Sequence, residues 1–328
     1  MQSPDVITVG ETMVILNPDQ SIPLEYAHSF SKQVGGAESN LAVGLSRLGH
    51  SVGWISRLGH DPFGRYIQQV IRGEGVDVSN TSFDDEAPTG VFFKERKFGD
   101  AVNVYYYRAN SAASRLQKEH VSEAYISGAK YVVISGILPA LSQSCYETTE
   151  EVIRIAQKYE IPIVFDPNLR LKLWKDKEEA ASVLNSIAAR SDFILTGQSE
   201  GYQLTGTHDP EEIAAFYKQK SPQATVIVKL GADGAYYSYG SENGYVPGFP
   251  VSKVVDPIGA GDSFCAGFIS AQLDGSDIHE SIKKGNAAGA VTVQISGDME
   301  GFPRPSELEQ MLQSTDEENG GVYEEVNR

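Results

Sequence analysis

The sequence predicts an α/β protein with a mostly parallel central sheet, covered by helices on both faces, and a small β-sheet that forms a lid. Two observations support this prediction. From residue 131 onward, short β-branched segments alternate with longer helical segments, and the links between them are short. This alternation is typical of parallel strands joined by helices. Before it, residues 89–108 are rich in aromatic and β-branched side chains around a charged turn, which indicates a hairpin outside the main sheet.

Composition and charge limit the class of protein. The chain has 328 residues, 41% of them hydrophobic, enough for one large α/β domain or two smaller ones, and no linker divides it. A net charge of −17 argues against nucleic acid or an anionic membrane as partner. Two cysteines, Cys145 and Cys265, are too few for a disulfide framework or a zinc site. Residues 1–10 lack a basic, apolar leader, so a cytoplasmic location is expected.

The N-terminal part begins with a buried strand at residues 6–9. Residues 12–34 are expected to be extended and irregular, because two prolines interrupt any helix there. Ser39 or Asn40 then starts a helix that ends at Gly49. The elements expected next are a strand at 52–55 and a helix at 62–72.

The aromatic segment that follows is expected to be a hairpin with strands at 91–93 and 102–107. Its turn contains charged and small residues, namely Lys97, Gly99 and Asp100. Together with residues 12–34, this hairpin would form the lid. Exposed strand edges are usually covered by another segment or another chain. We therefore expect a homodimer or higher homo-oligomer that pairs through the lid.

The remaining chain alternates strands and helices as far as about residue 312. Strands are expected at 131–135, 162–165, 193–195, 225–229 and 234–238, and helices at 142–159, 178–189, 200–204, 210–218, 262–273, 278–296 and 305–313. Residues 1–312 would therefore form one domain with the lid inserted in it. Residues 313–328 are acidic and lack apolar periodicity, so a flexible tail is expected.

Polar residues follow several of the predicted strands. In open α/β sheets, ligands bind outside the carboxyl ends of the strands. The residues at those ends are Asp166, Asn168, Arg170, Glu200, Gly231 and Asp233. Taken alone, each of them is more often a turn residue or a partner in a surface ion pair than a ligand-binding residue. Together they indicate a single crevice.

The stretch DPIGAGDSFCAG, residues 256–267, has the composition of an anion site. Gly259, Ala260 and Gly261 allow close approach of the backbone, and a helix from Asp262 would turn its unpaired N–H groups and positive dipole end toward them. A phosphate would be stabilised there. Asp262 is then either the helix N-cap or a carboxylate that faces an alcohol attacking the phosphate. The local sequence leaves both interpretations open.

Two segments resemble the signatures of the ribokinase-like (PfkB) family of carbohydrate kinases: GGAESNLAVGLSRLG from Gly35 and DPIGAGDSFCAGF from Asp256. The likeness runs from about residue 6 to residue 312. It implies a three-layer α/β/α ribokinase-like fold with a β lid, and a transferase that uses ATP with Mg²⁺ and, as in several relatives, K⁺. YYYRANSAAS, residues 105–114, is similar to the sugar-contacting hairpin of 2-keto-3-deoxygluconate kinases. That similarity implies transfer of the γ-phosphate to the terminal hydroxyl of this sugar acid.

Carried over by position, the resemblance assigns a role to each matching residue. Asp262 would be the catalytic base, with the amides of Gly259, Ala260 and Gly261 as an anion hole. The sugar side would comprise Gly35, Gly36, Ser39, Tyr106, Arg108, Arg170 and Asp298. The nucleotide side would comprise Asn168, Lys229, Gly231, Gly234 and Asn286. Glu200 would hold magnesium through water, and Asp256 with the backbone near Ile258 would hold a monovalent cation.

Two departures from the family pattern bear on the substrate. Gly197 replaces the Asn of the family's Asn-x-x-Glu motif, and Phe92 replaces a Tyr common in 2-keto-3-deoxygluconate kinases. Arg108 and Arg170 nevertheless favour an acid sugar, since each guanidinium matches a carboxylate. A fructokinase or other hexose kinase is the nearest alternative, and a non-catalytic sugar or nucleotide sensor comes next. A dinucleotide-dependent oxidoreductase is disfavoured because no early G-x-G-x-x-G follows the first strand.

Overall fold

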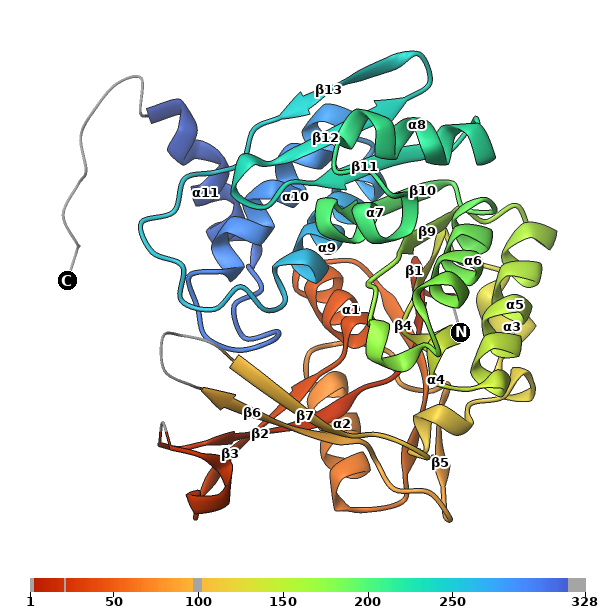
Figure 1. Ribbon diagram of the computed structural model, residues 1–328, viewed down its shortest axis with the longest axis vertical. Helices are drawn as coiled ribbons and strands as arrows, with labels where there is room; N and C mark the ends of the chain where they lie inside the picture. The colour runs from red at the N-terminus through yellow and green to blue at the C-terminus, as the bar shows by residue number, and fades with distance from the viewer. Residues whose placement is uncertain (1–2, 21, 97–101, 318–328) are drawn as a thin grey trace.

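A computed structural model of the chain describes residues 3–20, 22–96 and 102–317. Its centre is a nine-stranded sheet with the order β13-β12-β11-β10-β9-β8-β1-β4-β5 (Figure 1). Neighbouring strands from β11 to β5 run parallel, and β12 and β13 at one edge run antiparallel. This arrangement confirms the predicted fold class. The strands are β1 (Val6–Val9), β4 (Val52–Gly59), β5 (Thr81–Asp84), β8 (Tyr131–Ser135), β9 (Ile163–Asp166), β10 (Phe193–Gly197), β11 (Thr225–Lys229), β12 (Ala235–Tyr239) and β13 (Glu242–Val246).

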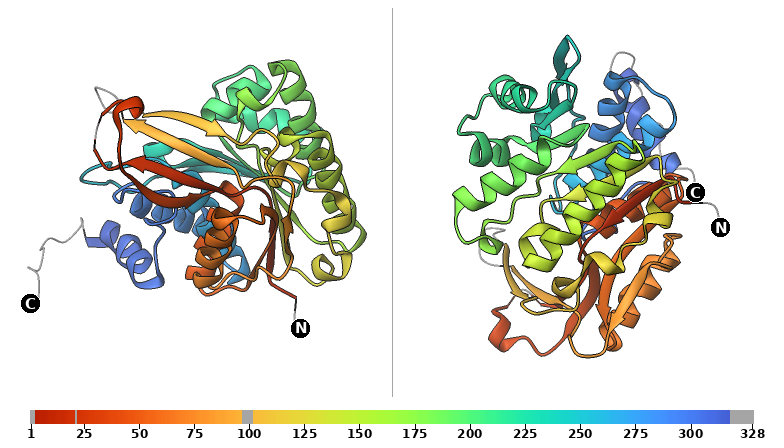
Figure 2. Two further views of the ribbon diagram at one scale, coloured as in Figure 1. Left: turned by 90° about the horizontal axis from the view of Figure 1, so that it is seen from below. Right: turned by 90° about the vertical axis from the view of Figure 1, so that its right-hand side faces the viewer.

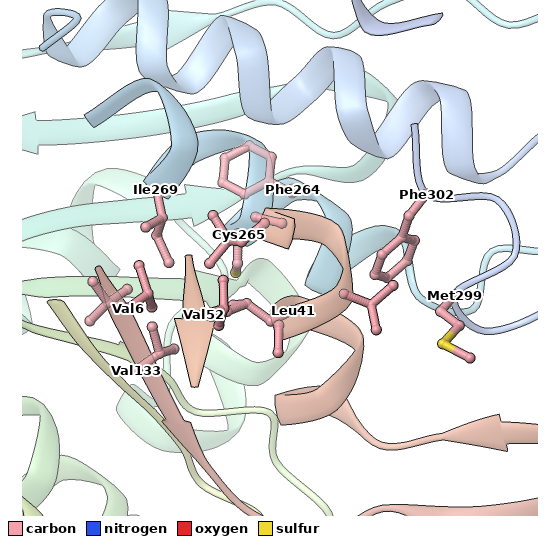
Figure 3. Packing of buried hydrophobic residues seen from close by; sticks show 14 of the residues in the cluster. Val6, Leu41, Val52, Val133, Phe264, Cys265, Ile269, Met299 and Phe302 are labelled. Carbon is pink, nitrogen blue, oxygen red and sulfur yellow. The ribbon is translucent and has the colours of Figure 1, made fainter. Parts of the chain in front are cut away.

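Helices cover both faces of this sheet, because successive side chains of a strand point to opposite faces. In β8, Val133 packs into one apolar cluster and its neighbour Ile134 into the other. Figure 3 shows part of the first cluster, in which Val6 of β1 and Val133 of β8 pack with Ile269. The helices on that face are α1 (Ala37–Arg47), α2 (Pro62–Gly73), α9 (Ala260–Leu273) and α10 (Ile278–Thr292). Those on the other face are α3 (Glu123–Ile126), α4 (Leu138–Leu141), α5 (Gln143–Lys158), α6 (Lys177–Ala188), α7 (Gln198–Thr205) and α8 (Pro210–Lys220).

The predicted lid is a separate four-stranded sheet that projects from the body (Figures 1 and 2). Its strands follow the order β3-β2-β6-β7, and they are β2 (Met13–Pro18), β3 (Phe30–Gly35), β6 (Val91–Arg96) and β7 (Val102–Tyr107). Met13, Ile15 and Phe92 form a small apolar cluster on its inner face. In β7, Tyr105 and Tyr107 alternate with Tyr106, which lines a cavity, so they lie on the outer face, where Tyr107 is 66% exposed. The lid therefore has an apolar inner surface that faces the carboxyl ends of the main strands.

The structure differs from the sequence predictions at several element boundaries. Residues 12–34 contain two regular strands, although they were expected to be irregular. Helix α1 starts at Ala37, before the predicted cap, and α10 ends at Thr292, four residues early. Helix α11 (Pro305–Glu317) continues through residues 313–317, which were assigned to the tail. The charged turn with Lys97, Gly99 and Asp100, and tail residues 318–328, lie outside the described residues. Within the described ranges, no helix has the length and apolar character needed to cross a bilayer.

Candidate active site

A cavity of about 890 Å³ lies between the lid and the carboxyl ends of the parallel strands. Ligand pockets typically measure ~300–1,000 Å³, so this one has room for two small ligands side by side. Most of the predicted site residues line it: Gly35, Gly36, Tyr106, Arg108, Asn168, Arg170, Glu200, Lys229, Gly231, Gly234, Gly259, Ala260, Gly261, Asp262, Asn286 and Asp298. Positions that are up to 263 residues apart in the sequence therefore meet in one cavity.

Two predicted site residues do not line this cavity. Ser39 is fully buried within α1, and its hydroxyl donates a hydrogen bond to the carbonyl of Gly36 at 3.0 Å. The prediction that Ser39 contacts the sugar needs correction, because α1 starts at Ala37 and Ser39 falls on the buried side of the helix. Asp256 is also buried, and its Oδ1 accepts a hydrogen bond from the Ile258 N–H at 3.1 Å.

The residues of the predicted anion hole lie at the start of α9. Gly259 is the N-cap residue and has φ +80°, a left-handed conformation that favours glycine. A Cβ at this position would also collide with the carbonyl oxygen of Asp298. The first N–H groups of a helix lack acceptors within it, and Ala260 and Gly261, which carry two of these groups, line the cavity. The positive end of the α9 dipole is thus directed into the cavity.

Asp262 is the third residue of α9, so its interpretation as the helix N-cap is wrong. Its Oδ2 accepts a hydrogen bond from Asn40 Nδ2 at 2.9 Å, and its Oδ1 lies 3.5 Å from Asn168 Nδ2. Burial raises the pKa of Asp262 to about 7, although the hydrogen bond from Asn40 opposes this shift. A carboxylate with this pKa can take up a proton near neutral pH.

Asn168 lies against this carboxylate, whereas the sequence placed it on the nucleotide side. Strand β9 ends at Asp166, and Asn168 two residues later has φ +39°, a left-handed conformation that asparagine tolerates. Its N–H donates to Asp166 Oδ1 at 3.2 Å, which fixes the turn. Two amides, one from Asn40 and one from Asn168, therefore orient both oxygens of Asp262.

Lys229 at the end of β11 lies beside the anion hole. Its Nζ donates to Asp166 Oδ2 at 2.8 Å, and a Cβ built on Gly261 would lie 3.7 Å from Nζ. Burial alone would lower the pKa of Lys229, but the charge of Asp166 raises it above its ordinary value. The Lys229 ammonium therefore lies close to the start of α9.

The rest of the nucleotide side combines glycine turns with an apolar wall. Gly231 and Gly234 have φ of +63° and +99°, and a Cβ on Gly234 would collide with the carbonyl oxygen of Val246. Asn286 donates from Nδ2 to the carbonyls of Val246 and Pro247 at 3.2 and 3.0 Å, which ties α10 to this turn. The apolar wall was missed from the sequence, and its residues are Phe249, Val251, Val254, Ile258, Ala290 and Val293.

Glu200 connects two strand ends at the rim of the cavity. Its two oxygens accept hydrogen bonds from the N–H groups of Leu169 at 2.8 Å and Gly197 at 3.0 Å. Burial raises the pKa of Glu200, and the nearby charge of Asp166 adds to this shift. Glu200 thus has a structural role at the start of α7, where Gly197 is the N-cap residue. No cluster of three or more acidic, histidine or cysteine ligands for a metal occurs in the described ranges.

The sugar side contains two buried ion pairs between the lid and the body. Arg108, just after β7, pairs with Glu11, which is 2% exposed and follows β1. Lys94 of β6 pairs with Asp298 at 2.5 Å. Neither Glu11 nor Lys94 was predicted from the sequence. Glu11 follows a strand end, which is a signal that could have identified it, but Lys94 has no such signal because a hairpin lysine is usually exposed.

Two other predicted features of the sugar side are present. Arg170 lines the cavity and forms no ion pair within the described part of the chain. The ring of Tyr106 lies 5.4 Å from that of Phe92, centroid to centroid, and both residues line the cavity. The Arg108 guanidinium lies 5.5 Å from the centroid of the Tyr106 ring. The aromatic hairpin therefore forms one wall of the sugar side.

Comparison with known proteins gives consistent results. Residues 3–305 match a protein family described as "pfkB family carbohydrate kinase". The chain is 40% identical over 323 residues to a 2-dehydro-3-deoxygluconokinase of Bacillus subtilis, covering 97% of this chain and 99% of the relative. It is 31% identical over 315 residues to a 5-dehydro-2-deoxygluconokinase of Halalkalibacterium halodurans, covering 94% of each. A solved structure of a putative ribokinase II from E. coli in complex with ATP and Mg²⁺ has a TM-score of 0.87 and 28% identity, covering 96% of this chain and 100% of that one.

These matches extend over nearly the whole chain, so they include both the lid and the body. The three-layer body, the β lid and the DPIGAGD loop agree with the fold of these similar proteins. The chain belongs to the pfkB family of carbohydrate kinases.

Proposed function

We propose that this kinase transfers the γ-phosphate of ATP to the terminal hydroxyl of 2-dehydro-3-deoxygluconate, giving the 6-phosphate, with Asp262 as the catalytic base. The observation that carries the substrate assignment is the charge of the sugar side. Three cations line the sugar side, namely Lys94, Arg108 and Arg170. Apart from the base, two carboxylates line it, those of Glu11 and Asp298. One positive charge is therefore available for the carboxylate of a sugar acid. A neutral hexose such as fructose would leave it unmatched.

The site also supports the chemistry of phosphoryl transfer. This reaction depends mainly on alignment and on stabilising the charge of the transferring group. The amides at the start of α9 and the ammonium of Lys229 would stabilise that charge. Asp262, held by Asn40 and Asn168, would orient the attacking hydroxyl and accept its proton late in the reaction.

Magnesium fits the donor groups of the nucleotide side. Mg²⁺ in kinases is held largely by phosphates and water, with one or two carboxylates. Glu200 and Asp166 are the carboxylates that line this side, and they would hold the ion directly or through water. When bound, Mg²⁺ neutralises charge on the phosphate oxygens.

A second candidate substrate is 5-dehydro-2-deoxygluconate, which several relatives of about 30% identity are named for. It is also a six-carbon acid with a terminal hydroxyl, so the charge of the sugar side fits it equally well. The two acids differ at C2, C3 and C5. At C5, the carbon next to the reacting one, the first carries a hydroxyl and the second a ketone.

The test is a panel of acceptors with ATP and Mg²⁺: both sugar acids, fructose, ribose and gluconate. We expect the highest kcat/KM with 2-dehydro-3-deoxygluconate. A preference for fructose or ribose would overturn the assignment to sugar acids. Arg108→Ala gives a second test, because it should lower kcat/KM for the acids strongly, whereas a hexose kinase would keep most of its activity on its true sugar.

A further inference from the structure

Lys94 is a lid residue with an unusual position. It belongs to β6, where Phe92 and Lys94 are two residues apart on one face of the strand and both line the cavity. Its side chain is buried, with a residue exposure of 8%, although a lysine in a surface hairpin normally extends into solvent. The ammonium lies 2.5 Å from Asp298 Oδ1, on the loop between α10 and α11. A lid cation therefore reaches the body through the sugar side of the cavity.

Asp298 lies next to the catalytic groups. Its carbonyl oxygen packs over Gly259 of the anion hole, and its Oδ2 packs over Gly35, since a Cβ on either glycine would collide with it. Burial raises the pKa of Asp298, while Lys94 and the amide of Asn40 lower it. The same Asn40 amide donates to Asp262. Asp298 and Asp262 both line the cavity, at the side where Asn40 also lines it.

The position of Asp298 against Gly259 and Gly35 indicates which substrate atom it would meet. A hydroxyl held by Asp262 is the terminal, reacting one, and the oxygen on the adjacent carbon is its nearest neighbour in the substrate. That oxygen would lie beside the ion pair, within hydrogen-bond reach of both the Asp298 carboxylate and the Lys94 ammonium. A hydroxyl both donates and accepts hydrogen bonds, so it satisfies a carboxylate and an ammonium at once. A ketone oxygen only accepts, and it would face the Asp298 carboxylate without a proton to share.

We propose that Lys94 and Asp298 together recognise the hydroxyl on the carbon next to the reacting one, and that this pair makes the kinase prefer 2-dehydro-3-deoxygluconate to 5-dehydro-2-deoxygluconate. In the open-chain acids, this position is C5, a hydroxyl in the first and a ketone in the second. Lys94 donates to the C5 oxygen, and the C5 hydroxyl donates to Asp298. The inference rests on the proposed function, because both compounds are candidate substrates of the same site.

The first test is Lys94→Met, which keeps the length of the side chain but removes its charge and donors. With 2-dehydro-3-deoxygluconate we expect kcat/KM to fall about 10- to 100-fold, as for loss of a hydrogen bond to a charged group. With the analogue that lacks the C5 oxygen, the same substitution should change kcat/KM less than about 3-fold. Equal losses on both compounds would show that Lys94 only holds the lid and would overturn the proposal.

The second test is Asp298→Asn, which nearly preserves shape and replaces the negative charge by an amide that can also donate. Its preference for the C5 hydroxyl over the C5 ketone, as a ratio of kcat/KM values, should fall at least about 10-fold relative to the unmodified enzyme. An unchanged ratio would contradict the role of Asp298. The matched control is Lys32→Met, since Lys32 lies in lid strand β3 over the ring of Tyr66, outside the cavity. In this variant, kcat/KM with 2-dehydro-3-deoxygluconate and the preference for the C5 hydroxyl over the C5 ketone should both stay unchanged.

Failure of the proposed function gives a different result. If the unmodified enzyme phosphorylates neither acid but is active on a neutral sugar, the substrate assignment fails before any variant is made. If it is active on 2-dehydro-3-deoxygluconate and Lys94→Met leaves its rate intact, only the recognition by Lys94 fails.

Discussion

Asp262→Asn separates the role of Asp262 as a base from its role in packing. Asparagine has almost the same shape, and its carbonyl oxygen can still accept the hydrogen bond from Asn40. It cannot take up the proton of an attacking hydroxyl. We expect kcat to fall at least about 100-fold. Binding of ATP, measured by calorimetry, should change little, because the nucleotide side is formed by other residues.

The same substitution should stabilise the fold at neutral pH. Burial raises the pKa of Asp262 from its ordinary value of 3.8 to about 7. Three pKa units correspond to about 4 kcal/mol between the two protonation states. The side chain is only partly buried by surface area, and the new amide also loses water contacts, so we expect a gain of roughly 1–2 kcal/mol. For a chain of 328 residues, that gain raises Tm by roughly 1.5–3 °C.

The sign of the pH dependence follows from linkage. The native pKa lies above the unfolded one, so between about pH 4 and 7 the native state binds more protons than the unfolded state. The contribution of Asp262 to stability therefore decreases as pH rises through this window and is constant above it. The gain from Asp262→Asn should be smallest near pH 4, increase up to about pH 7 and then level off in urea unfolding. Near-normal turnover would refute the base assignment, and a gain independent of pH would refute the raised pKa.

Four other predictions concern the same cavity and the lid. The acid limb of the kcat/KM profile should lie near pH 7, and Asn40→Ala should move it to higher pH, because Asn40 lowers the pKa of Asp262; an unmoved limb would contradict this. Gly259→Ala should destabilise the fold by about 1–3 kcal/mol and reduce kcat, measured by denaturation and kinetics, whereas a stable, active variant would refute the requirement for a left-handed residue. Potassium should raise the activity over sodium, and Asp256→Ala should abolish the difference. Light scattering at micromolar concentration should detect a dimer, and a strict monomer would count against pairing through the lid.

The architecture could be predicted because its signals are local. Short apolar segments alternate with amphipathic helices, and both of these patterns are set by neighbouring residues. The DPIGAGD loop was predicted for a similar reason, since glycines in a left-handed turn before a helix have few alternatives. The strand in residues 13–18 was missed although residues 13–16 are apolar, because the run is short and ends at Pro18, and its pairing with β3 and β6 depends on distant segments.

The pairing of charges in the site could not be predicted, because it depends on contacts between distant segments. Glu11 and Arg108 are 97 positions apart by their numbers, and Lys94 and Asp298 are 204 apart. In a hairpin, the sequence gives the alternation of faces but not which face meets the body. Ser39 shows that a local error in a helix boundary can also give a wrong site residue. A shift of the helix start by a few residues turns a predicted ligand into a buried side chain.

The two buried ion pairs have a consequence for how the lid can bind a substrate. A buried pair stabilises little relative to apolar residues, but removing one partner leaves a costly unpaired charge. Each pair would thus hold the lid against the body without a ligand. A guanidinium has five N–H donors and an ammonium three, and neither acid can occupy all of them. Arg108 and Lys94 can therefore keep their acidic partners and still donate to a sugar acid. The substrate does not have to break these pairs to bind, so little of its binding energy is lost in opening the cavity.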